Sequence, residues 1–353
     1  MERKLTRTVA VGDRLIGGGN PILVQSMTNT DTADAAATIA QIRALEDLGC
    51  DLVRVSVYNE ACARAVADIK KEIRIPLVAD VHFDPELALA AVENGVDKLR
   101  INPGNIGRRA DVQRVAAACA DKGVPIRIGV NAGSLNQEQR DKWGVSAQGL
   151  VESALAHAAI LEKEHFYDIV ISVKASDAVM NVEAYRLLSQ KCDYPLHIGV
   201  TEAGAGEAGL IKSAVGIGAL LLDGIGDTLR VSLTGSPLPE VTAGIEILRS
   251  VGLYDKGLQI ISCPTCGRTE IPLERIVEDV RQATKDVQAP LKVAIMGCVV
   301  NGPGEAREAD IGLAGGKDCA VIFRKEMVLR KVASEEAAKA LIEEIRKMTG
   351  ENA

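Results

Sequence analysis

The stretch that decides the fold is PLVADVHFDPELALAAVENGVDKLRINPG, residues 76–104. An apolar run at 76–83 leads into an alanine-rich helical pattern at 85–94. Gly95 is a typical helix stop, and a second apolar run follows at 98–104. A strand, a helix and a further strand in this order predict a parallel βαβ unit.

The same pattern extends over the first 250 residues. The apolar runs lie at 22–27, 51–57, 76–83, 98–104, 125–131, 168–175, 195–204 and 227–235. Eight units in about 250 residues match the usual size of a TIM (β/α)₈ barrel. An open, doubly wound sheet is the alternative, but the regularity of the units favours closure. We therefore expect an α/β barrel at residues 1–250.

The pattern changes after residue 250. We expect strands at 259–261, 291–296 and 319–324, and helices at 273–285 and 335–347. These elements predict a small α+β domain at residues 256–353, with no long linker before it.

Composition narrows the possible partners. The net charge of −7 excludes a general footprint for nucleic acid or for an anionic membrane surface. The chain has no apolar run long enough to span a membrane, and its first residues do not resemble a signal peptide. The eight cysteines are scattered except for one close pair, which is typical of reduced thiols. We expect a cytoplasmic protein.

Cations recur late in the predicted barrel strands. Arg54, Arg100, Arg127, Lys174 and Arg230 each share strand parity with other polar residues, so they are expected to face the lumen. Substrate sites of such barrels lie at the carboxyl ends of the strands. Five cations at one mouth predict a site for a substrate with several phosphate charges. The alternative is that each arginine pairs with a carboxylate, such as Asp80 or Glu202.

Other polar residues belong to the same expected mouth. They are His82, Asn131, Thr201 and Ser232. Glu202, at the start of a glycine-rich run, is a candidate proton donor or acceptor. His82 and His197 are weaker signals, because a single strand histidine is often only a hydrogen-bonded structural group.

The cysteine pair lies in the second predicted domain, as CPTCGR at residues 263–268, and Cys298 follows in GCVVNGPGE at 297–305. A C-x₂-C loop places two thiolates on one metal or cluster, and Cys298 is the expected third ligand. Cys319 or an oxygen donor would supply the fourth. Zinc sites usually have a second cysteine or histidine pair, which this domain lacks, so the spacing favours an iron–sulfur cluster over zinc.

These two strings resemble the 4-hydroxy-3-methylbut-2-enyl diphosphate synthase family. The resemblance extends through VQSMTNT (24–30), VRVS (53–56), ADVHF (79–83), LRINPGN (99–105), IRIGVN (126–131) and GVTEAG (199–204). It covers essentially the whole chain and is that of the short bacterial form.

The resemblance implies a barrel and a [4Fe–4S] cluster domain in a homodimer, in which the cluster domain of one subunit closes the barrel mouth of the other. The implied cluster ligands are Cys263, Cys266, Cys298 and Glu305, which leaves Cys319 unligated. The implied substrate-binding residues are Arg54, Arg100, Arg127, Asn131, Thr201, Arg230 and Ser232, with Glu202 near the reacting carbons. We add Lys174 and His82 to the expected substrate-binding residues, because both lie late in their predicted strands, at the barrel mouth.

The implied reaction is the reductive ring opening of 2-C-methylerythritol 2,4-cyclodiphosphate with loss of a hydroxyl as water, a step of the methylerythritol phosphate route to isoprenoids. Reduced flavodoxin or ferredoxin would supply the electrons, and Glu202 would donate a proton to the leaving hydroxyl. Glu305 could yield its iron to a substrate oxygen. One rival is a zinc-stabilised barrel lyase or aldolase with Lys174 as Schiff-base nucleophile. Another is an electron carrier or scaffold without its own substrate.

Overall fold

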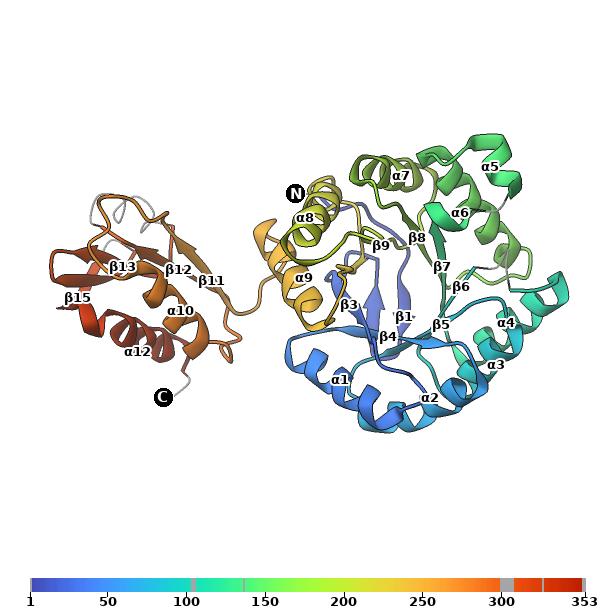
Figure 1. Cartoon of the computed structure of the whole chain (residues 1–353), viewed down its shortest axis with the longest axis horizontal. Helices are drawn as coiled ribbons and strands as arrows, with labels where there is room; N and C mark the ends of the chain where they lie inside the picture. The colour runs from blue at the N-terminus through green and yellow to red at the C-terminus, as the bar shows by residue number, and fades with distance from the viewer. Residues whose placement is uncertain (1, 103–105, 136, 299–307, 326, 351–353) are drawn as a thin grey trace. The chain divides into compact units, whose positions relative to one another are not determined.

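The computed structural model describes residues 2–102, 106–135, 137–298, 308–325 and 327–350. The chain divides into two compact units, Met1–Leu253 and Tyr254–Ala353. Each unit has its own sheet and helices (Figure 1). No helix within these ranges combines the length and the apolar character needed to cross a membrane.

The first unit is built on an eight-stranded parallel sheet. Its strands are β3 (Leu23–Met27), β4 (Leu52–Val57), β5 (Leu77–Val81), β6 (Lys98–Ile101), β7 (Ile126–Asn131), β8 (Ile169–Lys174), β9 (His197–Ile198) and β10 (Thr228–Leu229). Their order is β8-β7-β6-β5-β4-β3-β10-β9, and a parallel bridge from Ile171 to Leu196 joins the two end strands. The expected TIM barrel is confirmed, and all eight strands lie within the predicted apolar runs.

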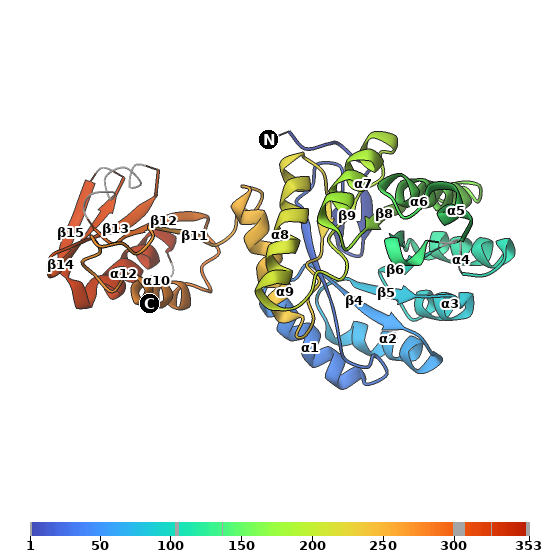
Figure 2. The same cartoon turned by 45° about the horizontal axis from the view of Figure 1, so that its top comes forward.

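Helices form a ring outside these strands (Figures 1 and 2). They are α1 (Ala35–Asp47), α2 (Glu60–Glu72), α3 (Pro85–Glu93), α4 (Arg109–Lys122), α6 (Ala147–Glu162), α7 (Ala178–Lys191), α8 (Gly206–Leu222) and α9 (Leu238–Ser250), with the short α5 (Gln137–Trp143) before α6. Asp84 and Asp177 show how several begin, since their side chains accept hydrogen bonds from first-turn N–H groups. Strand–helix alternation therefore directs each strand's carboxyl end to one mouth.

Two features of the barrel differ from the sequence prediction. Strands β9 and β10 have two residues each, because the chain leaves the sheet at Gly199 and Arg230 to form the mouth. A hairpin of β1 (Val9–Val11) and β2 (Arg14–Ile16) precedes the barrel and was not predicted. Its apolar side chains pack on Leu23 and Leu52, at the start of barrel strands. The hairpin therefore lies at the amino-terminal end, away from the mouth.

The second unit holds a five-stranded mixed sheet. Strands β11 (Leu258–Ser262), β12 (Leu291–Met296) and β13 (Ile311–Gly316) are parallel, whereas β14 (Cys319–Arg324) and β15 (Met327–Ala333) are antiparallel. Helices α10 (Leu273–Ala283) and α12 (Ala337–Thr349) share a buried apolar cluster with β12, β13 and β14. The expected α+β fold is confirmed, although β13 and β15 were not predicted. A 3₁₀ turn, Ser334–Glu336, precedes α12 and begins one residue before the predicted range.

Candidate functional site

Strand register brings the predicted mouth residues of the barrel side by side. Asp80 lies opposite Arg100, which in turn lies opposite Arg127. Asn131 lies opposite Lys174 on the next strand. Neighbouring residues in a parallel ladder point to the same face, so these side chains share one face of the barrel sheet.

Asp80 is the carboxylate to which several of these groups converge. Its Oδ1 accepts a hydrogen bond from Arg100 at 2.9 Å and lies 3.4 Å from His82 Nε2, and its Oδ2 is 3.7 Å from Arg54 Nε. Arg100 also contacts His82 directly. Burial alone would raise the pKa of Asp80, but Arg54 and Arg100 outweigh burial and hold that pKa well below its usual range. Asp80 is therefore charged, and the pairing predicted as an alternative occurs for two arginines.

Arg127 has no carboxylate partner among the described residues. Its side chain is 1% exposed, and its one hydrogen bond within them runs from Nη1 to Ser172 Oγ at 3.3 Å. Its Nε and Nη2 atoms are buried and unpaired there. Burial, together with repulsion from Arg54 and Arg100, lowers the pKa of Arg127 well below its usual value. A buried cation of this kind favours an anionic ligand.

Lys98 is a second buried cation of the lumen and was not among the predicted mouth residues. It shares parity with Arg100, is fully buried, and its Nζ has no hydrogen-bond partner in the described ranges. Burial is the main reason that its pKa lies well below the ordinary value, and Arg127 and Arg54 add repulsion.

Lys174 lies deep in the lumen beside a histidine. Its Nζ is 3.2 Å from His197 Nε2, and His197 Nδ1 is 2.8 Å from Thr228 Oγ1. Burial and nearby cations lower the pKa of both Lys174 and His197 well below their usual values. A Cβ on Gly199 would approach Lys174 Nζ to 2.8 Å, so glycine leaves room for the amine. His197 therefore has the structural hydrogen-bonding role that we considered for it.

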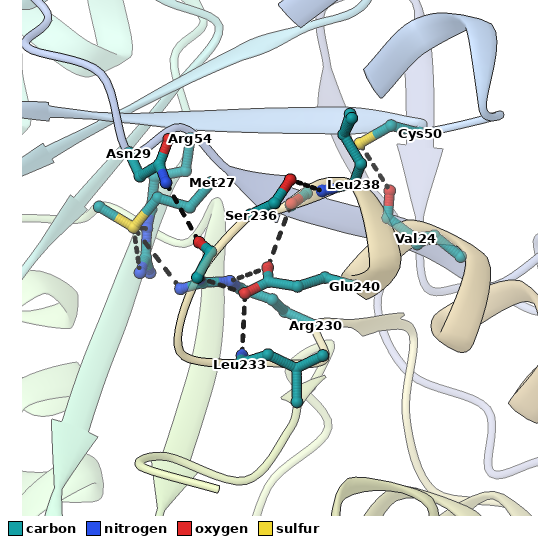
Figure 3. Close-up of polar contacts among 12 residues, drawn as sticks. Val24, Met27, Asn29, Cys50, Arg54, Arg230, Leu233, Ser236, Leu238 and Glu240 are labelled. Atoms are coloured by element: carbon teal, nitrogen blue, oxygen red, sulfur yellow. Dashed lines mark hydrogen bonds and ion pairs between the residues drawn. The ribbon is translucent and has the colours of Figure 1, made fainter. Parts of the chain in front are cut away.

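Arg230 is paired with a carboxylate that the sequence analysis missed. Its Nε and Nη2 lie 3.3 Å from Oε2 and Oε1 of Glu240, respectively, in the first turn of α9. Its Nη1 lies 3.5 Å from the sulfur of Met27, which also accepts from Arg54 (Figure 3). Glu240, and not Glu202, is thus the carboxylate that pairs with Arg230.

The remaining predicted residues lie at the rim. Thr201 is half-buried, and its N–H donates to the carbonyl of Ala175 at 3.3 Å. Glu202 is exposed and has a positive φ of 51°. Ser232 and Asn131 are half-buried. Glu202 is thus an exposed carboxylate that a bound molecule could reach.

The described lumen and mouth are rich in positive charge. The cations are Arg54, Arg100, Arg127, Arg230, Lys98 and Lys174, and the carboxylates that pair with them are Asp80 and Glu240. Like charges this close repel unless an anion joins them. The arrangement can bind a small ligand that carries several negative charges.

The second unit brings Cys263 and Cys298 to one end of its sheet. Cys263 directly follows β11 and Cys298 follows β12, and Ser262 is paired with Ile295 in the parallel ladder. The N–H of Gly297 donates to the sulfur of Cys263 at 3.2 Å. Hydrogen bonds from backbone N–H groups to cysteine sulfur are typical of iron–sulfur sites.

Cys266 lies on the loop that returns to the same glycine. Its N–H donates to Thr269 Oγ1 at 3.2 Å, and the N–H of Glu270 donates to the Gly297 carbonyl at 3.0 Å. A Cβ on Gly297 would approach Thr269 to 3.0 Å, so the loop lies directly against this glycine. The loop therefore keeps Cys266 at the end of the sheet where Cys263 and Cys298 lie.

The donor set suits a thiolate-bound cluster. Cys263, Cys266 and Cys298 are free of disulfides. Across the described residues, no three side chains of His, Cys, Asp or Glu are grouped closely enough to hold a metal ion. Glu305, the expected fourth ligand, lies outside the described residues. Cys319 is paired with Gly316 in the β13–β14 hairpin, at the same end of the sheet, so it too lies on this side.

Lys98, Met27 and Glu240 were the residues that the sequence analysis missed. Lys98 had a usable signal, since it has the parity of Arg100 two positions earlier in the same strand. Met27 and Glu240 had none, because an apolar strand residue and a first-turn helix glutamate are ordinary features.

Comparisons with known proteins agree across the whole chain. The GcpE TIM-barrel domain matches residues 6–245, and the GcpE protein C-terminal domain matches residues 259–347. The 4-hydroxy-3-methylbut-2-en-1-yl diphosphate synthase (flavodoxin) of Caldanaerobacter subterraneus is 56% identical over 350 residues, covering 99% of each chain. The protein of the same name from Ruminiclostridium cellulolyticum is 53% identical over 349 residues, again covering 99% of each.

Among solved structures, the N-acetylneuraminic acid synthetase of Leptospira borgpetersenii superposes with a TM-score of 0.52. The two chains are 14% identical, and the match covers 71% of this chain and 92% of the other. That similarity concerns the barrel fold alone. The two family matches, together with relatives identical at more than half of their positions, establish that this chain belongs to the GcpE family.

Proposed function

We propose that this chain is a 4-hydroxy-3-methylbut-2-enyl diphosphate synthase that converts 2-C-methylerythritol 2,4-cyclodiphosphate in the cytoplasm. In this reaction a ring C–O bond to phosphate breaks, a hydroxyl leaves as water, and a C=C bond forms. The substrate takes up two electrons, and protons complete the balance. The observation that carries the proposal is the cation-rich barrel mouth in a chain of this family.

The arginines and lysines account for substrate binding. Arg127 has buried donors without partners among the described residues, so a phosphate oxygen would satisfy them. Arg54 and Arg100 share the single carboxylate of Asp80, and their remaining donors are available to the second phosphate. As the ring opens, negative charge develops on the departing phosphate oxygen, and these fixed cations stabilise it.

Cys263, Cys266, Cys298 and Glu305 are the residues that would hold a [4Fe–4S] cluster. When bound, such a cluster supplies electrons one at a time. We propose reduced flavodoxin as the electron donor, as the names of the relatives state, with ferredoxin as the alternative. We also propose a homodimer in which the cluster-binding unit of one subunit closes the barrel mouth of the other.

Glu202 is the proposed proton donor to the leaving hydroxyl. Its carboxylate is exposed at the rim beside Thr201, and no described residue hydrogen-bonds to it.

The test is anaerobic purification followed by iron and sulfide analysis and turnover with reduced flavodoxin. We expect about four irons and four sulfides per chain and formation of the linear diphosphate from the cyclodiphosphate. A chain that contains iron and sulfide but does not consume the cyclodiphosphate would refute the substrate assignment. Zinc without iron would refute both the cofactor and the reaction.

One observation favours a second candidate function. Burial lowers the pKa of Lys174, and a lowered pKa is what a Schiff-base lyase or aldolase requires of its lysine nucleophile. Borohydride treatment in the presence of carbonyl substrates tests this candidate, because a Schiff base would become a stable adduct on Lys174. We expect no adduct.

A further inference from the structure

We propose that Glu240 is a positioning residue for substrate binding: it fixes Arg230 so that one edge of the guanidinium faces the diphosphate. Met27 is the uncharged contact that holds Arg230 and Arg54 around one sulfur atom. This inference rests on the proposed function, because only there does Arg230 bind the substrate.

Each oxygen of the Glu240 carboxylate accepts two hydrogen bonds. Oε2 accepts from Ser26 Oγ at 3.2 Å and from Arg230 Nε at 3.3 Å. Oε1 accepts from Arg230 Nη2 at 3.3 Å and from the N–H of Leu233 at 2.9 Å. The side chain of Glu240 is only 3% exposed. It therefore connects strand β3, Arg230 and the mouth segment at Leu233 (Figure 3).

The ion pair with Glu240 occupies one edge of the Arg230 guanidinium, and the other edge stays available to a ligand. Arginine has five N–H donors in a fixed plane. Glu240 occupies the edge formed by Nε and Nη2, and within the described part of the chain Nη1 contacts only the weak acceptor Met27 Sδ at 3.5 Å. The side chain is 16% exposed, so it is not sealed from the mouth. The free edge, between Nη1 and Nη2, is suited to a phosphate oxygen pair.

The uncharged sulfur of Met27 lies between two arginines and contacts both of them. Its sulfur accepts from Arg54 Nε at 3.1 Å and Nη2 at 2.9 Å, and it also contacts Arg230. A carboxylate at this position would hold both arginines more strongly, but it would also repel an anionic substrate. A thioether orients the two guanidinium groups without adding a competing negative charge.

The electrostatics of Arg54 agree with this arrangement. Burial lowers the pKa of Arg54 to about 10, Asp80 opposes that effect, and the repulsion of Arg230 adds to it. The two arginines therefore repel each other across Met27. A bound diphosphate would remove this repulsion, so the site is held ready for an anion.

The test uses the full-length holoenzyme and the Glu240→Gln variant, with Glu246→Gln as matched control. Glu246 lies on the same helix, is 58% exposed and pairs with Arg249. We expect Glu240→Gln to raise the KM for the cyclodiphosphate about 10- to 100-fold, with a much smaller change in kcat. Glu246→Gln should match the wild type, and iron content should be equal in all three proteins.

A double-mutant cycle with Arg230→Ala shows whether Glu240 acts through Arg230. We expect the double variant to have the KM of Arg230→Ala alone. Independent effects that multiply, or a loss of kcat at unchanged KM, would overturn the proposal. Arg230→Lys is the second test if Glu240→Gln does not fold. One ammonium group cannot pair with Glu240 and also present a second edge, so its KM should rise similarly, and a wild-type KM would overturn the proposal.

Wild-type turnover separates this inference from the proposed function. A wild-type holoenzyme that does not convert the cyclodiphosphate contradicts the proposed function. If the wild type is active and Glu240→Gln has the same KM, only the positioning role of Glu240 is wrong. Binding of inorganic pyrophosphate, measured by calorimetry, gives a readout without turnover. It should weaken in Glu240→Gln and not in Glu246→Gln.

Discussion

Replacement of Asp80 by asparagine tests the charge balance of the barrel mouth. Asp80 is buried, and its two oxygens serve Arg100 at 2.9 Å and Arg54 at 3.7 Å. Asparagine has nearly the same size but carries no charge. The variant therefore leaves buried Arg100 and half-buried Arg54 without their shared counter-ion and creates no cavity.

The expected loss of stability is large. Removing one partner of a buried ion pair costs about 3–5 kcal/mol, because the remaining charge is uncompensated. In a unit of this size each kcal/mol lowers Tm by about 2–4 °C. We therefore expect Tm of the barrel to decrease by about 6–20 °C.

The pH dependence has a defined sign. Arg54 and Arg100 hold the pKa of folded Asp80 below its unfolded value, despite the opposing effect of burial. Such a carboxylate contributes its full stability above the unfolded pKa of about 4. The contribution is lost as pH falls toward the lower folded pKa. The difference between wild type and Asp80→Asn should therefore be constant near pH 7 and decrease below about pH 4.

Urea unfolding at pH 7 is the assay. Trp143, in α5 of the barrel, is the single tryptophan of the chain and reports this unit by fluorescence. Asp193→Asn is the matched control, because Asp193 is 58% exposed and pairs with Arg7 at 2.9 Å. It should cost no more than about 1 kcal/mol. Equal losses in the two variants would refute the view that the Asp80 charge holds the mouth arginines.

Three further substitutions test other parts of the site. Gly129→Ala places a Cβ 2.5 Å from Arg100 Nε, so substrate KM should rise at least tenfold, whereas Gly133→Ala, with nothing within 4 Å, should be silent in the same assay. Cys319→Ser should retain full iron and sulfide, because the resemblance leaves this thiol unligated; loss of iron would make it a ligand. Glu202→Gln should keep its iron and lower kcat about 10²- to 10⁴-fold, and full turnover would exclude it as the proton donor.

The fold could be predicted because each signal was local. Apolar runs followed by alanine-rich helices specify βαβ units, and eight such units close into a barrel. The strands β1, β2, β13 and β15 escaped prediction for an equally local reason. Strands β1 and β2 are three-residue strands of a hairpin, β15 is an edge strand, and Ile311–Gly316 (β13) contains three glycines.

The positions of the mouth residues were also largely predictable. Side chains alternate across a strand with a period of two, so parity alone directed Arg54, Arg100, Arg127 and Lys174 to the lumen. Lys98 belongs to the same set and could have been found by the same rule. Parity does not say which cation is paired, because the partner comes from another strand or from a helix.

The sequence by itself therefore determined the barrel, the second unit, the family resemblance and the accumulation of cations at one mouth. Only the tertiary structure decided that Asp80 serves Arg54 and Arg100, that Glu240 serves Arg230, and that Arg127 has no carboxylate partner among the described residues. The physical reason is that the two kinds of information act over different distances along the chain. Backbone periodicity fixes the direction of each side chain, whereas its charge partner is fixed by the packing of α9 beside β3 and by the register between strands.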